Sequence, residues 1–582
     1  MDETQANHPQ DTSQKDWMSL AQRVDQHTRA SLGQWSLGQS PMQNAVVWLD
    51  WISHLATAPG KQLSLVKTLA DDIHGAAIHL TRVDGKPREC CTDPRFLSPT
   101  WQTLPFNAFA QAFQITERFW SQATTAVPGL NHRHEERARF AARQWLDVFS
   151  PSNVPWLNPD VLAATKTELG MNFARGFQYW LDDAYRLISK QPAQGSEEFK
   201  VGENVAITRG KVVFKNDLIE LIQYSPSTPK VYGEPVLIVP AWIMKYYILD
   251  LSPHNSLVKF LVDRGHTVFM ISWKNPSADD CEKGLEAYRT EGVMAAINTV
   301  SKILPDHRIH GVGYCLGGTM LEIAAATMGR DKDSRLATMT LFAAQGDFTE
   351  AGELLLFINE SEVNIIEAMM AEQGYLKGTQ MAGTFQLLHS NDLIWSRALK
   401  NYMLGVRDQP SDLMAWNADT TRMPYRMHSE YLHKLFLHNE LASGHYEVNG
   451  APIWFTDIKI PCFAVCTETD HVAPWKSVFK LHLLPLDITF VLTSGGHNAG
   501  IVSEPGHQHR HFQVHHRTAD EPYTAPEQWH ASVPRQEGSW WPAWESWLSS
   551  HSGERLITPP RMGVPGHKGK LVDAPGEYVH QS

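Results

Sequence analysis

A cysteine between two glycines carries the clearest chemical signal in this chain. The segment Gly313-Tyr314-Cys315-Leu316-Gly317 follows a short apolar run and precedes a helix-forming run. That context predicts a tight strand-to-helix turn, or nucleophile elbow, with Cys315 at its tip. Glycines leave room where a Cβ would collide with neighbouring backbone, and the N–H groups of the following helix stabilise a thiolate and an oxyanion. We therefore interpret Cys315 as a nucleophile rather than a buried structural cysteine.

Two later segments supply a candidate acid and a candidate base. An elbow enzyme needs an Asp or Glu and then a His, in that order along the chain. Asp470 follows the apolar run 460–466, and His497 lies in a glycine-flanked segment after the run 488–492. Because ligands bind where parallel strands end, we expect both side chains to meet Cys315 at that edge of the sheet.

Two other residues compete for these roles. Asp347 follows another predicted strand and is the alternative acid. His471 is the alternative base, but it adjoins Asp470 and would struggle to reach both of its partners.

A thioester is a suitable target for a thiolate, because exchange of one thiolate for another is nearly balanced in energy. The tetrahedral intermediate then needs two backbone N–H donors. One is expected from Leu316, and the other from the loop after an early strand, where Ala241 and Trp242 are the candidates. An ordinary connecting loop remains the alternative for the second site.

Apolar runs that alternate with helical stretches after about residue 200 predict the elements that position these residues. Strands are predicted at 235–240, 267–273, 308–314, 337–343, 460–466 and 488–492. Helices are predicted at 253–264, 284–303 and 316–328. This alternation is typical of an α/β fold with a mostly parallel sheet covered on both faces.

The chain is expected to divide into four regions. Residues 1–85 form an N-terminal extension that the sequence determines poorly, and residues 86–200 form a mainly helical N-terminal domain. The catalytic domain spans 201–560, with an insertion at about 350–455 that is too long to be a loop and is predicted to cap one edge of the sheet. Residues 561–582 form an irregular tail.

The composition excludes several classes of protein. Hydrophobic residues make up 42% and charged residues 20% of the 582 positions, which is unlike a disordered or collagen-like chain. The formal net charge is −12, so no global basic surface is present and no nucleic-acid partner is expected. No apolar run reaches the roughly 20 residues that a membrane helix needs, so no transmembrane segment is expected.

The start of the chain and the cysteines favour the cytosol. The first residues are polar and lack the apolar stretch of a signal peptide. The six cysteines form no recurring CxxC pairs, so neither a disulfide framework nor a zinc site is predicted. Reduced thiols are typical of a cytosolic protein.

Two clusters of unusual residues receive structural interpretations. Five histidines between residues 507 and 516 have no regular ligand spacing, so we predict a solvated loop and no metal site. Trp540, Trp541, Trp544 and Trp547 have helical spacing and predict one packed helix face. A role at a granule surface, for these residues or for a helix near 43–57, is the alternative.

Taken together, these segments resemble polyhydroxyalkanoate synthases, most like the class I type. The resemblance covers roughly residues 88–575, and it implies an α/β-hydrolase-like fold. It rests on TDPRFLSPTWQTLPFNAF (92–109), FKVGENVAITRGKVVFKNDLIELIQY (199–224), PAWIMKYYILDLSPHNSLVKFLVDRGHTVFMISWKNP (240–276), GYCLGGT (313–319), TDHVAPW (469–475), SGGHNAG (494–500) and GSWWPAWESWL (538–548). Residues 1–85 contribute little to it.

By resemblance, the family's nucleophile, aspartate and histidine fall on Cys315, Asp470 and His497. Asp250 matches an acidic position of the family and is given no catalytic role. The residues at 242, 244, 314 and 316 differ from those expected of the family, which leaves the acyl chain length of the monomer open.

The resemblance implies that (R)-3-hydroxyacyl-CoA, expected to be short-chain such as 3-hydroxybutyryl-CoA, is polymerised with release of CoA through an acyl-cysteine. It implies no bound metal or organic cofactor. The implied partners are the growing polyester, the surface of a cytoplasmic polyester granule with its associated proteins, and a second copy of the chain in a homodimer. Whether His497 or Asp470 deprotonates the incoming 3-hydroxyl is open.

Water must be kept from the acyl-cysteine, or the enzyme becomes a thioesterase. Aromatic residues of the insertion are candidates for excluding it, with simple packing as the alternative: Phe357, Trp395, Tyr402, Trp416 and Tyr425. A cysteine thioesterase or intracellular polyester depolymerase is the alternative enzyme, which would give a free hydroxy acid. A non-catalytic granule scaffold is the alternative of another class.

Overall fold

The chain divides into two units. The computed structural model describes residues 10–36, 38–81, 93–189, 191–192, 194–381, 383, 394–554 and 556–582. The first unit comprises residues 1–39, 195–381 and 411–582, and the second comprises residues 40–194 and 382–410.

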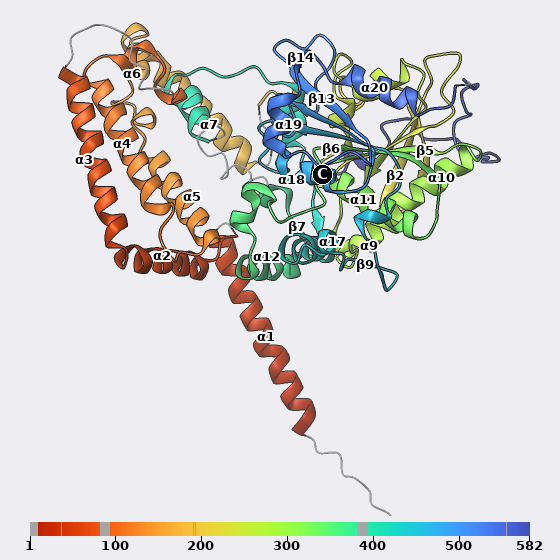
Figure 1. Ribbon diagram of the computed structural model, residues 1–582, viewed down its shortest axis with the longest axis horizontal. Coiled ribbons are helices and arrows are strands. Elements are labelled where there is room, and N and C mark those ends of the chain that lie inside the picture. The colour runs from red at the N-terminus through yellow and green to blue at the C-terminus, as the bar shows by residue number, and fades with distance from the viewer. Residues whose placement is uncertain are drawn as a thin grey trace, which may run out of the picture. The chain divides into compact units, whose positions relative to one another are not determined.

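A ten-stranded sheet runs through the described part of the first unit (Figure 1). Its spatial order is β1-β2-β4-β3-β5-β6-β11-β12-β13-β14. The strands are β1 (Gly210–Lys215), β2 (Ile219–Tyr224), β3 (Val236–Val239), β4 (Val268–Trp273), β5 (Ile309–Tyr314), β6 (Leu336–Phe342), β11 (Cys462–Thr467), β12 (Ile488–Thr493), β13 (His511–Arg517) and β14 (Arg535–Glu537). The six central strands from β4 to β12 are parallel to one another, and the two strands on either side of them pair antiparallel. This confirms the predicted mostly parallel sheet.

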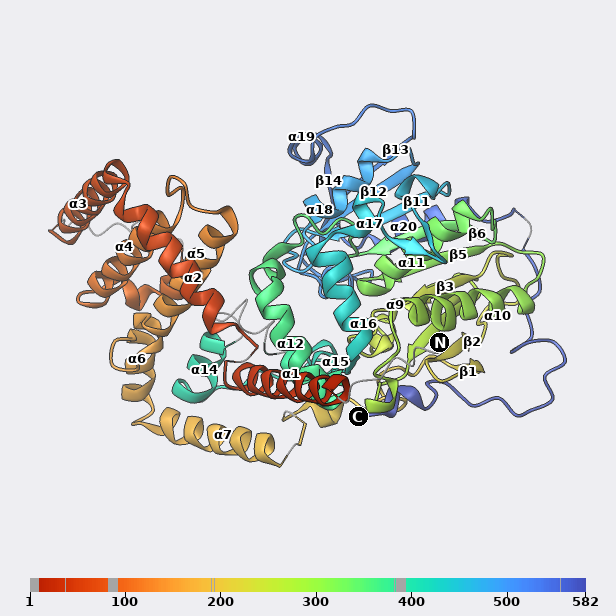
Figure 2. The same ribbon diagram turned by 90° about the horizontal axis from the view of Figure 1, so that it is seen from below.

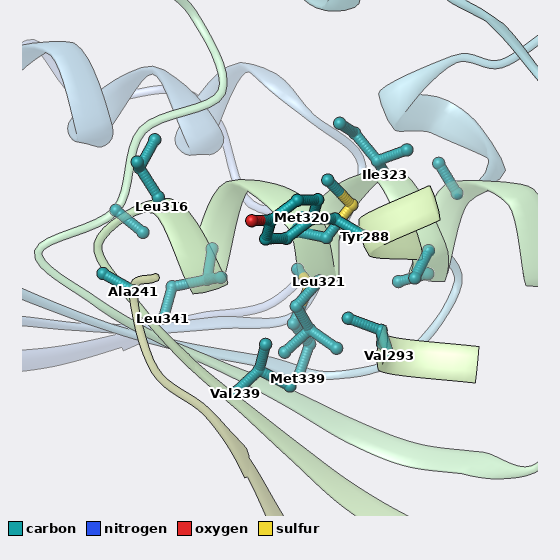
Figure 3. Packing of buried hydrophobic residues seen from close by; sticks show 14 of the residues in the cluster. Val239, Ala241, Tyr288, Val293, Leu316, Met320, Leu321, Ile323, Met339 and Leu341 are labelled. Carbon is teal, nitrogen blue, oxygen red and sulfur yellow. The ribbon is translucent and has the colours of Figure 1, made fainter. Parts of the chain in front are cut away.

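Both faces of the parallel centre of the sheet are buried, because alternate side chains of its strands enter different cores. Leu237 and Val239 belong to one core, whereas Val236 and Ile238 belong to the other. On the first face, Val239, Met339 and Leu341 meet Tyr288, Met320 and Leu321 from the helical layer (Figure 3). A period of two with apolar residues on both sides is what a doubly covered parallel sheet requires.

Helices cover the two faces separately. The first face carries α9 (Leu285–Ala287), a π-helix (Tyr288–Met294), α10 (Ala295–Ile303), α11 (Leu316–Arg330), α18 (Trp475–Phe479) and α19 (Pro526–Ser532), several of which are seen over the strands in Figure 2. The second face carries α8 (Leu257–Val262) and α20 (Trp541–Ser550). Trp540, Trp541 and Trp544 are fully buried there, which confirms the predicted packed face.

A long insertion separates β6 from β11. Its helices and short strands are α12 (Glu360–Gln373), β7 (Tyr375–Leu376), α14 (Ser396–Ala398), a π-helix (Leu399–Met403), α15 (Asp412–Ala418), β8 (Met423–Pro424), α16 (Tyr425–Glu430), a π-helix (Tyr431–Leu437), α17 (Glu440–Ser443), β9 (Glu447–Val448) and β10 (Ala451–Pro452). Residues 343–381 and 411–461 belong to the first unit and are called the cap here; residues 382–410 belong to the second unit. Helix α1 (Gln10–Trp35) is also in the first unit, where Ala30 packs against Ile365, Ala368 and Met369 of the cap.

The second unit is helical. It contains α2 (Pro41–Ala56), α3 (Pro59–Thr81), α4 (Phe106–Thr124), α5 (His132–Val148), α6 (Pro159–Thr167) and α7 (Met171–Ile188), together with α14 and the first π-helix of the insertion. Ser40 and Asn158 cap α2 and α6 through their side chains, and a proline occupies the first turn of each. These are ordinary signals for a helix start. No helix in the described ranges is long and apolar enough to cross a membrane.

The sheet contains strands that the sequence analysis missed. The histidine-rich segment was predicted to be a solvated loop, and that is wrong for its second half, because residues 511–517 form β13 and pair with β12. Its polar residues hide the strand pattern, although Phe512 and Gln513 are buried. The hairpin of β1 and β2 was also missed; Asn216 accepts the N–H groups of Leu218 and Ile219 in its turn.

Candidate active site

Cys315 lies at the sharp turn between β5 and α11. Its backbone has φ +52° and ψ −125°, a conformation that a residue with a side chain rarely adopts. The Cys315 N–H donates to the carbonyl of Phe342 at 2.9 Å, and the Cys315 carbonyl accepts the N–H of Gly318 at 2.8 Å. Such strain costs roughly 1–3 kcal/mol and is common at functional sites. The turn presents the thiol at the carboxyl end of the parallel strands.

The glycines around Cys315 are required by close backbone contacts. A Cβ at Gly313 would lie 2.3 Å from Gly318 Cα, and a Cβ at Gly317 would lie 2.1 Å from the carbonyl oxygen of Val239. Gly318 is crowded by a side chain instead, since its Cβ would lie 2.3 Å from the Cβ of Ala344. The start of α11 therefore lies directly against β3 and the loop that follows it.

Asp470, which is buried, pairs with the largely covered His497 beside the elbow. Asp470 follows β11 and His497 follows β12, and His497 Nδ1 lies 2.8 Å from Asp470 Oδ2. The other carboxylate oxygen of Asp470 accepts the N–H groups of Val472 and Ala473, each at 2.8 Å. Burial by itself raises the pKa of Asp470, but His497 and these N–H groups hold that pKa below its ordinary value. Asp470 is thus an ionised acceptor that fixes the imidazole ring.

His497 joins Asp470 to Cys315. His497 also lies near Cys315, because the charge of a Cys315 thiolate acts on its ring. Burial lowers the pKa of His497, but the charges of Asp470 and of a Cys315 thiolate outweigh it and raise that pKa well above its ordinary value. Since Nδ1 faces Asp470, Nε2 is the nitrogen left for the thiol. The three side chains have the arrangement of a base-activated nucleophile.

Two tyrosines surround this group. The Tyr314 ring lies 5.8 Å from the His497 ring, centroid to centroid, and its hydroxyl donates to Asn498. Tyr431, from the cap, is close enough to Cys315 that the charge of a thiolate adds to burial in raising the pKa of its phenol. The sequence analysis missed Tyr431, because nothing in the local sequence links it to an elbow more than a hundred residues away.

The alternative acid lies in a different network. Asp347 accepts the Thr349 N–H at 2.8 Å and the Asn439 side chain at 3.0 Å, and it pairs with Lys480 at 3.2 Å. His471, the alternative base, accepts the N–H of Glu353 through its backbone carbonyl. Asp470 makes the hydrogen bond to His497, so Asp470 and His497 remain the candidate acid and base.

The two candidate oxyanion segments lie against each other. A Cβ at Gly317 would lie 2.5 Å from the carbonyl oxygen of Pro240, and Figure 3 shows the side chains of Leu316 and Ala241 on neighbouring segments. The Leu316 N–H is in the first turn of α11, where N–H groups have no acceptor within the helix. The Trp242 side chain is buried against Trp273 and Tyr288.

The aromatic residues of the insertion have separate positions. Trp416 is buried and donates through Nε1 to the carbonyl of Lys245 at 2.7 Å. Tyr402 belongs to the second unit, where its hydroxyl donates to Asp183 of α7 at 2.9 Å. Trp395 belongs to that unit too. Within the described residues, no group of three or more His, Cys, Asp or Glu side chains is arranged to hold a metal.

Three family descriptions match the chain. "Poly-beta-hydroxybutyrate polymerase (PhaC) N-terminus" matches residues 92–261, and "alpha/beta hydrolase fold" matches residues 234–504. "Poly-beta-hydroxybutyrate polymerase N terminal" matches residues 19–61. That last match corrects the view that residues 1–85 carry little family resemblance. The second match agrees with the predicted hydrolase-like fold.

Relatives match along most of the chain. A poly(3-hydroxyalkanoate) polymerase of Methylorubrum extorquens is 37% identical over 86% of this chain and 83% of its own length. A poly(3-hydroxyalkanoate) polymerase subunit PhaC of Cupriavidus necator is 34% identical over 84% of this chain and 83% of its own. Among solved structures, a carboxyl esterase from Bacillus coagulans aligns over 49% of this chain and 89% of its own, with 16% identity and a TM-score of 0.31.

Proposed function

The chain belongs to the poly(3-hydroxyalkanoate) polymerase family, and we propose that it polymerises short-chain (R)-3-hydroxyacyl-CoA into polyester through an acyl-Cys315 intermediate. It is an acyltransferase of that family, and 3-hydroxybutyryl-CoA is the proposed substrate. The proposal is carried by one arrangement: Cys315 at the tip of the elbow, His497 beside it, and Asp470 hydrogen-bonded to His497. The chemistry as proposed uses no metal and no organic cofactor.

The first half-reaction transfers an acyl group from CoA to the enzyme. His497 Nε2 takes the thiol proton of Cys315, and the thiolate attacks the thioester carbonyl carbon. The oxyanion is held by the N–H of Leu316 and by an N–H of Ala241 or Trp242. When the intermediate collapses, the carbon–sulfur bond to CoA breaks, and the CoA thiolate receives the proton from His497.

The second half-reaction extends the chain. A 3-hydroxyl group attacks the acyl carbon on Cys315, its proton goes to a base, and an ester bond forms as the Cys315 thiolate leaves. His497 is the proposed base. The surroundings of Asp470 support this choice, since one of its oxygens faces His497, the other accepts two backbone N–H groups, and the side chain is fully buried.

Water is the competing acceptor in that step. The cap brings Tyr431 close to Cys315, and Tyr431 packs against Phe436 and Phe348. An aromatic wall beside the acyl-cysteine lowers the local concentration of water and favours a polyester over a free acid. Without that exclusion the same three residues would give a thioesterase, which is the alternative function.

The proposed setting is the surface of a polyester granule in the cytoplasm. A water-insoluble product must accumulate as a separate phase, and family membership supports a homodimer that works there with granule-associated proteins. The product and the CoA thioester are the proposed partners at the active site itself.

One experiment tests the activity and the nucleophile together. The purified chain is incubated with (R)-3-hydroxybutyryl-CoA, and both thiol release and the acyl product are measured for wild type, Cys315→Ala and Cys281→Ala. Cys281 is a matched control, because it is a partly exposed free thiol like Cys315 but lies in a different part of the fold. We expect insoluble polyester with stoichiometric CoA from wild type and Cys281→Ala, and neither product from Cys315→Ala.

The other outcomes separate the alternatives. Thiol release with only soluble hydroxy acid would favour the thioesterase. No release from this substrate or from longer acyl-CoA thioesters would favour the scaffold. Release of CoA, with polyester formed, from longer acyl-CoA thioesters alone would refute the short-chain preference but leave the proposed polymerase activity standing.

A further inference from the structure

The loop after β3, which carries the second candidate oxyanion donor, is held by a segment of the cap. Residues 240–247 leave the sheet at the end of β3, and residues 416–421 of the cap run beside them. An isolated antiparallel bridge joins Met244 to Thr420, and the Thr421 N–H donates to the carbonyl of Ile243 at 3.4 Å. The cap segment thus forms backbone hydrogen bonds with a loop that no longer pairs with neighbouring strands of the sheet.

Side chains reinforce this pairing at both ends. Trp416 Nε1 donates to the carbonyl of Lys245 at 2.7 Å, and the Tyr247 hydroxyl donates to Asp419 at 3.0 Å. Nearest to the elbow, the Thr421 hydroxyl donates to the carbonyl of Trp242 at 2.6 Å. This is the shortest of the three side-chain contacts, and both Thr421 and Trp242 are buried.

The Thr421 hydroxyl fixes the direction of a backbone carbonyl. A peptide group is planar, so holding the Trp242 carbonyl fixes the plane between Trp242 and Ile243. That plane is linked through the Trp242 Cα to the preceding one, which carries the Trp242 N–H. If the hydroxyl is removed, the buried Trp242 carbonyl loses this donor. Rotation of the peptide between Trp242 and Ile243 toward another donor then becomes favourable.

We propose that Thr421 is a positioning residue for the oxyanion loop, so that the cap takes part in stabilising the transition state. This inference rests on the proposed acyl transfer at Cys315. It assigns to the cap a second role besides bringing Tyr431 to the nucleophile. Thr421 itself touches no reacting atom and acts through the Trp242 peptide.

The test removes the hydroxyl while keeping the shape. Thr421→Val is compared with wild type in the full chain, with (R)-3-hydroxybutyryl-CoA as substrate, by the rate of CoA release and by the pre-steady-state rate of acylation. Loss of one oxyanion donor costs about 10²–10³-fold in rate, and a displaced donor should cost less, so we expect kcat to fall about tenfold. KM should change less than twofold, because the ground-state carbonyl is not yet an oxyanion.

Two further variants separate positioning from folding. Thr421→Ser retains the donor and should recover at least half of the wild-type kcat. Thr299→Val removes a similarly buried hydroxyl that donates to a backbone carbonyl at 2.8 Å within α10, and it should leave kcat unchanged. If Thr421→Val does not fold, Thr421→Ala takes its place, with the same expected loss of kcat.

Several results would overturn the inference. A Thr421→Val or Thr421→Ala protein with kcat within twofold of wild type would do so, as would a loss that Thr421→Ser fails to recover. A rise in KM at constant kcat would place Thr421 in substrate binding instead. If wild type itself makes no polyester and Cys315→Ala changes nothing, the proposed function fails; if wild type polymerises and Thr421→Val is unimpaired, only the role of Thr421 fails.

Discussion

Replacing Asp470 by asparagine should disable the base without disturbing the shape of the site. In wild type, Oδ1 of Asp470 accepts two backbone N–H groups and Oδ2 faces His497 Nδ1 at 2.8 Å. The amide oxygen of asparagine is expected to keep the two N–H donors, because its NH₂ group cannot accept them. The NH₂ group then faces Nδ1 and donates to it. The remaining proton of the neutral ring is placed on Nε2, toward Cys315, where a proton acceptor is needed.

The expected loss of activity is large. A carboxylate and an imidazolium 2.8 Å apart attract by about 6 kcal/mol at an effective dielectric constant of about 20. Losing half to three-quarters of that raises the barrier by about 3–4.5 kcal/mol, or about 10²–10³-fold in rate at 1.36 kcal/mol per factor of ten. The wrong tautomer adds to this, and the same exchange in serine proteases costs about 10⁴-fold. We expect kcat/KM for CoA release to fall at least about 10³-fold.

The assay compares Asp470→Asn with Asp347→Asn. Asp347 is the matched control, since it is a partly buried aspartate after a neighbouring strand and it binds Thr349, Asn439 and Lys480. Its variant should keep activity within about tenfold of wild type. The residual activity of Asp470→Asn should rise with pH, because hydroxide can then deprotonate Cys315 without His497.

Two results would refute this reasoning. A loss of less than tenfold in Asp470→Asn would show that Asp470 does not hold the tautomer of His497. A larger loss in Asp347→Asn than in Asp470→Asn would exchange their roles. Circular dichroism and thermal unfolding of both variants identify a loss that is due to misfolding.

Three other changes have expected outcomes that follow from single contacts. Gly317→Ala places a Cβ 2.1 Å from the Val239 carbonyl oxygen, so activity should fall more than about 10²-fold and the melting temperature should drop; near-normal kinetics would contradict the close contact. Cys315→Gly should be more stable to denaturant than Cys315→Ala by about 0.5–2 kcal/mol, because glycine adopts φ +52° without strain. The greater chain entropy that glycine loses on folding offsets part of this gain. Equal stability of the two variants would mean that the elbow is unstrained. Burial raises the pKa of Glu322 from 4.5 to about 8, and neither of its buried oxygens has a hydrogen-bond partner among the described residues. As pH rises, the unfolded chain releases this proton before the folded chain does. The free energy of unfolding should therefore fall between pH 4.5 and 8, by up to about 1.4 kcal/mol per pH unit. Glu322→Gln should flatten this decline, measured as the urea midpoint at each pH, and an unchanged slope would refute the buried neutral acid.

The parallel strands could be predicted because each is a continuous apolar run between polar turns. Strands β3, β4, β5, β6, β11 and β12 all lie within two residues of their predicted bounds. A strand that is buried on both faces has no polar alternation to dilute the signal. The outer strands β1, β2, β13 and β14 were missed because their patterns mix polar and apolar residues; Glu220 of β2, for example, is buried beside Lys215.

The elbow at Cys315 could be predicted because its geometry depends on neighbours in the chain. Gly313 and Gly317 are needed for the turn itself, and α11 begins at the next residue after Cys315. Local geometry of this kind is specified by adjacent residues. The positions of Asp470 and His497 could be predicted because each follows the end of a strand, β11 or β12, that is itself a clear apolar run.

The sequence by itself determined the elbow, the order of its candidate partners, the doubly covered sheet and the family resemblance. Only the tertiary structure decided which aspartate meets His497, because Asp470 and Asp347 both follow strands at the same edge. It also decided that the cap brings Tyr431 to Cys315 and Thr421 to the Trp242 carbonyl. These pairs are more than a hundred residues apart, and their contacts arise from how the cap packs on the sheet, which no local pattern encodes.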